Sequence, residues 1–252
     1  MGRGGSPVAV EAIILAGGLG SRLRSVVADV PKPLAPINGV PFLDILLARL
    51  NRYDFLRKVV LAVGYQAQMV ISRYDGMRHD YNFAIDFSVE TELLGTGGGI
   101  KQASKMTTAE TILVFNGDTF VGVDLRKLIR EHQRHGAPLT AVVKKVRDAR
   151  RYGTVILNDQ GLLVAFREKV AQPSEGNELI NAGLYAMNRR VLGLLKEGKS
   201  SLETDVLPII AQSGHIRGYV TNGRFIDIGI PETYLSAGDY LHGVLTNEGG
   251  RS

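Results

Sequence analysis

The sequence predicts an α/β fold in which a mostly parallel, mixed β-sheet is flanked by helices. Through the first half of the chain, apolar runs of strand length alternate with amphipathic stretches of helical length, which is the rhythm of βαβ units. The 252 residues are 44% hydrophobic, so one domain can bury a substantial core. A hairpin pattern in the second half adds antiparallel strands, which makes the expected sheet mixed.

The first half of the chain contains four expected strands with helices between them. The strands are apolar runs at residues 10–15, 58–63, 84–89 and 111–115. Apolar residues recur at helical spacing over residues 41–53, 66–74 and 97–105. Pro41 suits the first turn of the first of these helices, because its fixed backbone angle is compatible with that position.

After residue 118 the alternation changes. We expect a helix over 124–135, a strand over 139–146 and a hairpin over 153–166 with its turn at 158–161, which we interpret as an insertion forming a lid or second lobe. A strand at 183–187, helices over 190–196 and 202–212, and a pair of strands between 216 and 228 follow. Ser200 and Glu203 are expected to form the capping box of the last helix.

Composition and charge limit the classes of function. We expect a single domain over residues 9–243, with a disordered lead at 1–8 and a disordered tail at 244–252. The absence of cysteine and of any apolar run of membrane-spanning length predicts a cytoplasmic protein without a membrane partner. The net charge of +5 would suit nucleic acid, but the basic residues are interleaved with 25 acidic ones, so an anionic small substrate accounts for the excess.

A glycine loop follows the first expected strand. It runs Leu15-Ala16-Gly17-Gly18-Leu19-Gly20-Ser21-Arg22, and Pro31-Lys32-Pro33 comes shortly after it. Glycines let an anion approach successive backbone N–H groups and allow the dihedral angles that turn these donors inward. Arg22 and Lys32 add two cations at the carboxyl end of a strand, where open α/β sheets bind ligands. The segment therefore predicts a binding site for a triphosphate.

Two common nucleotide-binding motifs match the chain only in part. Gly18-x-Gly20 begins a dinucleotide fingerprint, but Leu23 stands where the third glycine is required. The pattern G-x-x-x-x-G-K-S occurs over residues 193–200, yet a helix is expected before it, whereas a P-loop needs a strand there. We interpret this second match as a coincidence.

The motifs of the chain, taken in order, resemble those of the sugar-1-phosphate nucleotidylyltransferases. Besides AGGLGSRL and PKPL, the matching segments are LGTGGGI (94–100), NGD (116–118), FREK (166–169), NAGLY (181–185) and FIDIG (225–229). The resemblance implies the Rossmann-like nucleotide-diphospho-sugar transferase fold. It also implies transfer of a nucleoside monophosphate from a nucleoside triphosphate to a sugar 1-phosphate, with small-molecule substrates and no nucleic-acid partner. The oligomeric state stays open, with a homodimer as one option.

The resemblance assigns roles to five charged residues. Both reactants are anions, so alignment and charge neutralisation can supply most of the catalysis. In the family, aspartates matching Asp118 and Asp227 hold Mg²⁺. Arg22 and Lys32 are expected to bind the β and γ phosphates, and Lys169 the sugar phosphate or the α-phosphate.

The residues by themselves also allow purely structural roles for the two aspartates. Asp118 could cap a turn, and Asp227 could pair with an arginine such as Arg224. The basic cluster at residues 144–151, which includes Arg151, matches no motif and is expected to be a solvated face.

Base recognition is assigned to Glu90, the first residue of E-T-E-L-L-G-T-G, which is similar to the guanylyl and mannose-phosphate type of the family. A carboxylate can accept from N1–H and from the exocyclic amine of guanine, whereas the carbonyls of uracil would repel it. Leu93 stands where the family has proline. The other residues expected to bind the nucleotide are Leu15, Ala16, Gly17, Gly18, Gly20, Gly95, Thr96 and Asn116, and those expected to bind the sugar are Glu168, Asn181 and Gly183.

Within the family, the short chain and the TGGGI segment are most similar to the D-glycero-α-D-manno-heptose 1-phosphate guanylyltransferases. This implies GTP as donor and a role in making bacterial surface polysaccharide such as capsule or lipopolysaccharide. Mannose 1-phosphate guanylyltransfer and N-acetylmuramate 1-phosphate uridylyltransfer stay open. A non-catalytic subunit that senses nucleotide sugars is a third alternative, and the intact charged residues argue against it.

Overall fold

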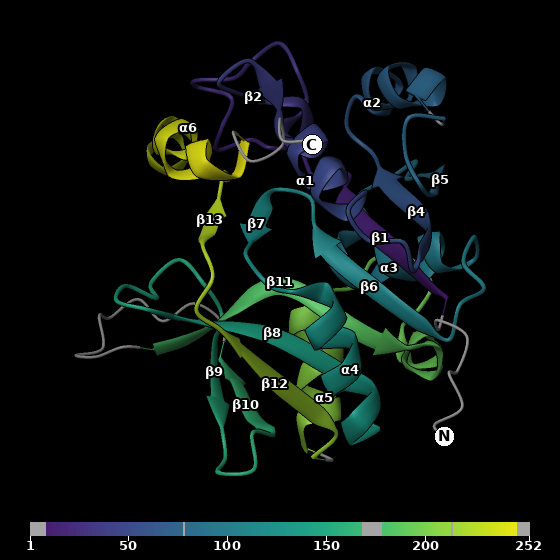
Figure 1. Ribbon diagram of the computed structural model, residues 1–252, viewed down its shortest axis with the longest axis vertical. Coiled ribbons are helices and arrows are strands. Elements are labelled where there is room, and N and C mark those ends of the chain that lie inside the picture. Colours follow the sequence, from purple (N-terminus) through teal and green to yellow (C-terminus); the bar gives the residue numbers. More distant parts are fainter. Residues whose placement is uncertain (1–8, 78, 168–177, 213, 246–252) are drawn as a thin grey trace.

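The computed structural model describes residues 9–77, 79–167, 178–212 and 214–245, and it confirms the predicted α/β fold. Nine strands of these residues form one sheet (Figure 1). Its first part is parallel and contains β6 (Thr111–Asn116), β1 (Val10–Ala16), β4 (Leu56–Val63) and β5 (Ala84–Val89), in that order. These four strands match the four expected from the sequence, so the apolar runs predicted them correctly.

The second part of the sheet is joined to the first through β11 (Glu178–Asn188). This long strand pairs antiparallel with β6 and also with β8 (Leu139–Val146). Beyond β8 lies β12 (Ile216–Thr221), which runs parallel to it. On the other side, β11 meets β9 (Thr154–Leu157), which pairs antiparallel with β10 (Leu163–Arg167). The sheet is therefore mixed, as predicted.

Two expectations about the second half are wrong. The hairpin β9–β10 is an edge of the main sheet and no separate lid, because Val155 and Leu163 are buried in the same core as β11. The two strands after residue 216 do not pair with each other. Instead β13 (Phe225–Asp227) pairs antiparallel with β7 (Thr119–Val121), which brings two segments about a hundred residues apart together directly after Asp118.

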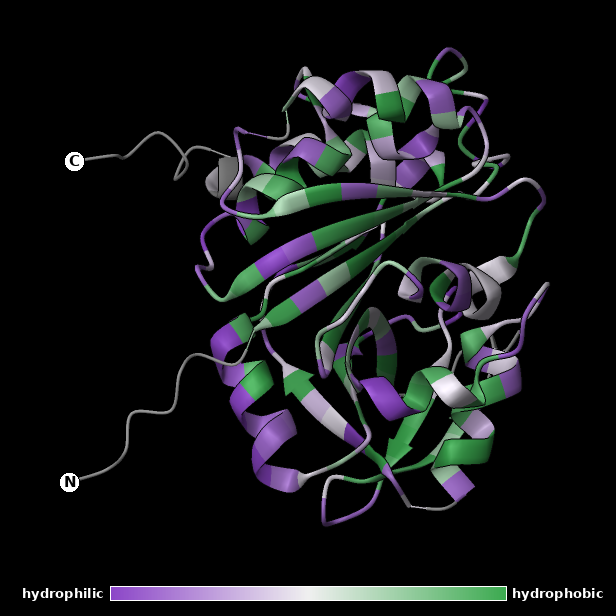
Figure 2. Ribbon diagram, turned by 90° about the vertical axis from the view of Figure 1, so that its right-hand side faces the viewer, coloured by the Kyte–Doolittle hydropathy of each residue, from purple (hydrophilic) through white to green (hydrophobic). Residues whose placement is uncertain are grey.

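The helices cover the sheet on both faces. Alternate residues of β1 face opposite sides: Ala12 and Ile14 belong to one core, whereas Ile13 belongs to the other. The first core contains residues of α1 (Phe42–Leu50), α2 (Ala67–Tyr74), α4 (Leu125–His135) and α6 (Pro231–Leu245). The second contains residues of α3 (Gly95–Ser104) and α5 (Leu207–Gln212). Figure 2 shows the long apolar stretches of the strands between helices of mixed hydropathy.

The short elements correct two further expectations. The stretch expected as a helix over 190–196 is a 3-10 helix, Arg189–Leu194. The helix expected over 202–212 begins as a π-helical turn, Leu202–Val206, and its N-cap is Ser201 rather than Ser200, because the Ser201 hydroxyl accepts from the backbone N–H of Thr204. The remaining short elements are the 3-10 helices Lys32–Leu34 and Asp75–Met77 and the strands β2 (Pro36–Ile37) and β3 (Val40–Pro41).

Glu11 is an acidic residue inside the apolar first strand, and the fold explains it. Its side chain is buried, and its carboxylate accepts from the backbone N–H groups of Thr108 (2.5 Å) and Ala109 (2.9 Å). These bonds compensate the desolvation of the carboxylate and hold the loop that leads into β6. Among the described residues, no helix combines the length and the apolar character needed to cross a membrane.

Stability in acid is expected to depend on His132. The ring is buried in α4, and its Nδ1 lies 2.9 Å from the Thr140 hydroxyl. Burial lowers the pKa of His132 to about 4, with a smaller contribution from the positive charge of Arg190. An unfolded histidine titrates near pH 6.5. Between about pH 6.5 and about pH 4, the unfolded chain therefore binds a proton at His132 that the folded chain does not bind.

The free energy of unfolding should therefore decrease as the pH falls from about 6.5 to about 4, by at most about 3 kcal/mol from this residue. Urea denaturation across that range measures it. His132→Asn keeps a polar partner for Thr140 but cannot titrate, so its acid dependence should be shallower. An unchanged slope in this variant would contradict the assignment.

Candidate nucleotide site

A cavity of about 360 Å³ lies where β1 and β6 end. Its wall contains ten of the residues that the sequence singled out, which are Leu15, Ala16, Gly17, Gly18, Lys32, Glu90, Gly95, Thr96, Asn116 and Asp118. Pro33, Leu93, Gly117 and Lys199 complete the lining. Gly20 is not in the wall, and its backbone has a φ of +60° and packs against the Cβ of Lys32. The glycine loop thus forms one side of a cavity at the carboxyl end of the sheet, as expected.

Gly17 and Gly117 are glycines because the backbone is crowded at this point. A Cβ on Gly17 would lie 2.9 Å from Oε1 of Glu90, and a Cβ on Gly117 would lie 2.5 Å from the carbonyl oxygen of Leu15. The Gly117 N–H donates to that same carbonyl at 2.9 Å. The end of β1 therefore contacts the turn after β6 directly, which places Asp118 beside the glycine loop.

Asp118 follows that turn and forms an ion pair with Lys32. The Lys32 Nζ donates to Oδ2 at 2.5 Å, and the Thr119 hydroxyl donates to Oδ1 at 3.0 Å. Burial by itself would raise the pKa of Asp118, but the charge and the hydrogen bond of Lys32 outweigh burial and hold that pKa below its usual value. The carboxylate is thus ionised and bound to a cation.

Asp227 lies at the end of β13, next to Asp118. The Ile228 N–H donates to the carbonyl oxygen of Asp118 at 2.9 Å, which extends the β7–β13 pairing. Oδ1 of Asp227, Oδ2 of Asp118 and Nη2 of Arg22 all lie within 4 Å of the point where a Cβ on Gly229 would stand. The structure therefore brings together two carboxylates and an arginine that are far apart in the sequence.

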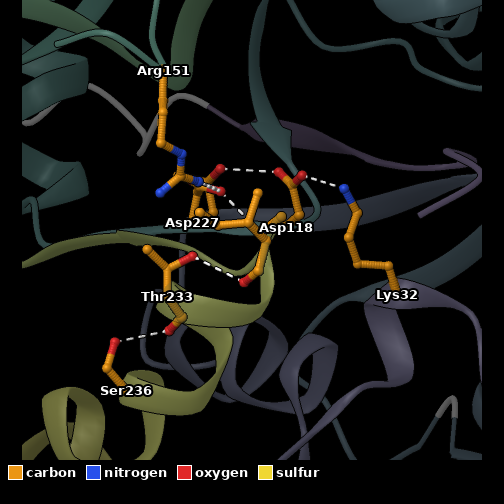
Figure 3. A network of polar contacts seen from close by, with 9 residues as sticks. Lys32, Asp118, Arg151, Asp227, Thr233 and Ser236 are labelled. Carbon is orange, nitrogen blue, oxygen red and sulfur yellow. Dashed lines mark hydrogen bonds and ion pairs between the residues drawn. The ribbon is translucent and has the colours of Figure 1, made fainter. Parts of the chain in front are cut away.

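The cation that binds Asp227 is Arg151. Its Nη2 donates to both carboxylate oxygens, at 3.0 and 2.9 Å, and Figure 3 shows Arg151 and Lys32 reaching the two aspartates from different sides. The solvated face predicted for Arg151 is therefore wrong, and Arg224 is not the arginine that pairs with Asp227. Arg224 instead donates to the carbonyl of Tyr240. No motif marked Arg151, because the contact depends on how the chain before β9 folds back toward β13.

The pair of aspartates could hold a divalent cation. Each carboxylate already binds a positively charged group, and both project toward the same point beside the cavity. The described residues contain no cluster of three or more acidic, histidine or cysteine ligands. Magnesium is commonly bound by one or two carboxylates together with substrate phosphates and water, so the donor set suits a cation that arrives with a phosphorylated substrate.

Glu90 projects into the cavity between two glycines. Its Oε1 would lie 2.9 Å from a Cβ on either Gly17 or Gly99, and its Oε2 accepts from the backbone N–H of Leu94 at 3.2 Å. Burial raises the pKa of Glu90, while the hydrogen bond from Leu94 opposes the shift. A half-buried acceptor held in this way can recognise N–H groups of a ligand.

The glycine-rich start of α3 packs against the segment 198–202, which the sequence analysis did not connect with the site. The Gly97 and Gly98 N–H groups donate to the carbonyl oxygen of Ser200, at 2.9 and 3.3 Å. The Thr96 hydroxyl donates to Glu203 at 2.5 Å and accepts from the Leu202 N–H at 2.8 Å. These contacts cap the helix from within the protein, and they account for the Thr-Gly-Gly-Gly sequence by packing.

The structure also shows whether the segment 193–200, which matches the P-loop pattern, forms a P-loop. A 3-10 helix precedes it instead of a strand, so it does not form a P-loop. Its lysine, Lys199, nevertheless lines the cavity. The sequence does not predict this position for Lys199, because only the packing on α3 directs the segment toward the site.

Of the expected sugar-binding residues, Gly183 lies next to Asn116, and Asn181 is hydrogen-bonded to Gly183. The Asn181 side chain donates to the Tyr185 hydroxyl at 2.5 Å and accepts from the Gly183 N–H at 3.3 Å. Gly183 has a φ of +69°, and a Cβ there would lie 2.6 Å from Nδ2 of Asn116. In the described part of the chain, the buried Oδ1 of Asn116 has no hydrogen-bond partner. Glu168 and Lys169 lie outside the described residues.

Comparison with known proteins agrees with the motifs. Residues 11–242 match the family described as nucleotidyl transferase. The chain is 44% identical to the D-glycero-α-D-manno-heptose 1-phosphate guanylyltransferase of Aneurinibacillus thermoaerophilus over 90% of this chain and 96% of that protein. It is 37% identical to the enzyme of the same name from Campylobacter jejuni, over 94% of this chain and all of the relative.

Solved structures also resemble this fold. The crystal structure of HddC from Yersinia pseudotuberculosis superposes with a TM-score of 0.79 at 35% identity, covering 91% of this chain and 98% of that one. A second structure of HddC, described as complexed with GMP-PN, has a TM-score of 0.77. Both comparisons extend over nearly the whole of each chain.

The packing of α3 predicts the effect of adding a methyl group to its glycines. A Cβ on Gly98 would lie 2.1 Å from the carbonyl oxygen of Gly198, so Gly98→Ala must displace backbone and should lower the free energy of unfolding by about 1–3 kcal/mol. Chemical denaturation measures this change. Gly193→Ala is the control, because no atom lies within 4 Å of its added Cβ, and it should change stability by less than about 0.5 kcal/mol. Equal stability of the two variants would contradict the packing argument.

Proposed function

The chain belongs to the nucleotidyl transferase family, and we propose that it transfers GMP from GTP to D-glycero-α-D-manno-heptose 1-phosphate, releasing pyrophosphate and forming a GDP-sugar. The observation that carries this proposal is the similarity to two heptose 1-phosphate guanylyltransferases over nearly their whole length. A cavity with a glycine loop, two carboxylates and several cations supports it independently. Such a product would feed the synthesis of a bacterial surface polysaccharide, in the cytoplasm.

The reaction forms one P–O bond and breaks another. A phosphate oxygen of the sugar 1-phosphate attacks the α-phosphorus of GTP, and the bond between the α-phosphorus and the bridging oxygen of pyrophosphate breaks. The chain needs no covalent intermediate for this, because positioning and charge neutralisation suffice. Backbone N–H groups of residues 17–20 would cradle the triphosphate, and Arg22 and Lys32 would bind the leaving pyrophosphate.

Asp118 and Asp227 are proposed to hold Mg²⁺ together with phosphate oxygens of the substrate. When bound, the ion would neutralise negative charge on the phosphates. Lys32 and Arg151 occupy the two carboxylates in the ligand-free protein, and substrate binding would let Lys32 move from Asp118 toward the phosphates. The ion pairs thus orient both aspartates before the substrate arrives, and the pair with Lys32 holds the pKa of Asp118 below its usual value.

Glu90 is proposed to recognise guanine, and Asn181, Gly183 and Glu168 to contact the sugar, with Lys169 near the reacting phosphates. The support for Glu90 is its place in the cavity wall and its fixed carboxylate. The Asn181 amide is engaged with Tyr185 and with the Gly183 N–H, so a sugar hydroxyl would share it with these partners. Oδ1 of Asn116, which has no hydrogen-bond partner among the described residues, offers a further acceptor beside Gly183.

A matrix of nucleoside triphosphates against sugar 1-phosphates, with pyrophosphate release as readout, tests the substrates. We expect the highest kcat/KM with GTP and the manno-configured heptose 1-phosphate, and lower values with mannose 1-phosphate or N-acetylmuramate 1-phosphate. Glu90→Gln should lower kcat/KM for GTP about 10- to 100-fold and that for UTP much less, because the amide replaces an acceptor with a donor. A preference of the wild type for UTP would overturn the role of Glu90.

The carboxylates are tested by Asp118→Asn and Asp227→Asn. Each should lower kcat at least about 100-fold, because the site loses charge that binds the phosphates and their counter-ion. Each also breaks a partly buried ion pair, so the free energy of unfolding should fall by up to about 3 kcal/mol, and kcat is compared on variants shown to be folded. Asp148→Asn is the matched control, since Asp148 also pairs with an arginine, Arg150, but on the exposed surface. Near-normal turnover in either site variant would remove that aspartate from the metal site.

A further inference from the structure

We propose that Lys199 is a specificity-determining residue that donates to the O6 and N7 edge of guanine, opposite Glu90. This inference rests on the proposed function, because it assumes a guanine nucleotide in the cavity. Lys199 lines the cavity wall and follows Gly198 in the segment that packs on α3. No carboxylate of the described residues pairs with it, so its ammonium group is available to a ligand.

The backbone directly after Lys199 is held against α3. The carbonyl of Ser200 accepts from Gly97 and Gly98, and the Leu202 N–H donates to the Thr96 hydroxyl. A lysine on a backbone held in this way keeps the direction in which its side chain leaves the wall, although its stem stays flexible.

Leu94 connects Lys199 to the part of the cavity where Glu90 lies. The Leu94 N–H donates to Oε2 of Glu90 at 3.2 Å, and the Leu94 carbonyl accepts from the Ser200 N–H at 2.9 Å. Ser200, the residue next to Lys199, is therefore hydrogen-bonded to Leu94, and Leu94 in turn is hydrogen-bonded to Glu90. Lys32, the other lysine of the wall, is engaged with Asp118. The acidic Glu90 and the basic Lys199 thus line the same cavity from segments joined through Leu94, whereas Lys32 is paired with Asp118.

Guanine offers the complementary pattern of donors and acceptors. Its N1–H and exocyclic amine suit a carboxylate, and its O6 and N7 are acceptors that suit a lysine or arginine. Adenine carries an amine where guanine has O6, so a lysine there would face a donor. Uracil would satisfy a lysine through its carbonyl but would repel the carboxylate. Glu90 therefore disfavours uracil, and it also disfavours adenine, whose N1 is an acceptor. Lys199 adds discrimination against adenine at the position of O6.

The experiment measures binding of GMP-PNP and AMP-PNP by calorimetry and, in parallel, kcat/KM for GTP and ATP with the heptose 1-phosphate. The variants are Lys199→Met, which keeps the length of the side chain without its charge, and Lys199→Arg, which keeps the donor. Lys196→Met is the matched control, because Lys196 is exposed three residues earlier and outside the cavity wall. Each pair of nucleotides has the same phosphates, so an effect on the phosphates cancels in the ratio.

We expect Lys199→Met to lower the preference for guanine over adenine about 10- to 100-fold in Kd and in kcat/KM, while Lys199→Arg and Lys196→Met keep most of it. An equal loss for both nucleotides, or no loss, would overturn the inference. A wild type without a preference for GMP-PNP would overturn it as well. A wild type that prefers GMP-PNP but transfers GMP to no sugar phosphate would refute the proposed function, and the Kd ratios would still decide the role of Lys199.

Discussion

The site depends on the convergence of two carboxylates at one point beside the cavity. Asp118 and Asp227 meet because β7 and β13 pair directly after the first of them, and the Ile228 N–H completes the pairing on the Asp118 carbonyl. Two negative charges near each other at a partly buried place would repel each other. Lys32 and Arg151 relieve this repulsion, and each comes from a different part of the chain. The short β7–β13 ladder and the two cations therefore form one cooperative unit.

Glycine has two separate uses around this unit. In the loop after β1 and in the turn after β6, it allows the backbone to approach Glu90 and Leu15. At the start of α3, it allows the segment 198–202 to lie against the helix, with the carbonyl of Ser200 capping two N–H groups. Because the N–H groups of Gly97 and Gly98 donate to Ser200, they are not available to a nucleotide. The same packing brings Lys199 to the wall of the cavity. A glycine-rich motif in this chain is therefore as much a packing surface as a phosphate site.

Local patterns predicted most of the fold and part of the site. The first four strands and the helices between them follow from hydrophobic periodicity, as does the helix expected over 124–135, of which Asp124 is the N-cap. The glycine loop, Glu90 and Asp118 lie together because they follow the carboxyl ends of parallel strands β1, β5 and β6, and Asn116 is the last residue of β6. Lys32 joins them through its ion pair with Asp118. The hairpin β9–β10 was found with its turn but placed wrongly, because the burial of its apolar side depends on β11, which is distant in the sequence.

By itself, the sequence determined the chemistry available to this protein: the order of strands and helices, a glycine loop with two cations, and a small number of carboxylates in apolar surroundings. Only the tertiary structure decided which charges meet. Arg151 pairs with Asp227, Arg224 does not, and Lys199 enters the cavity wall from a segment whose P-loop match is a coincidence. The reason is physical. Periodicity and residue type report on neighbours within a few residues, whereas ion pairs and close backbone contacts depend on strand pairings that join segments about a hundred residues apart.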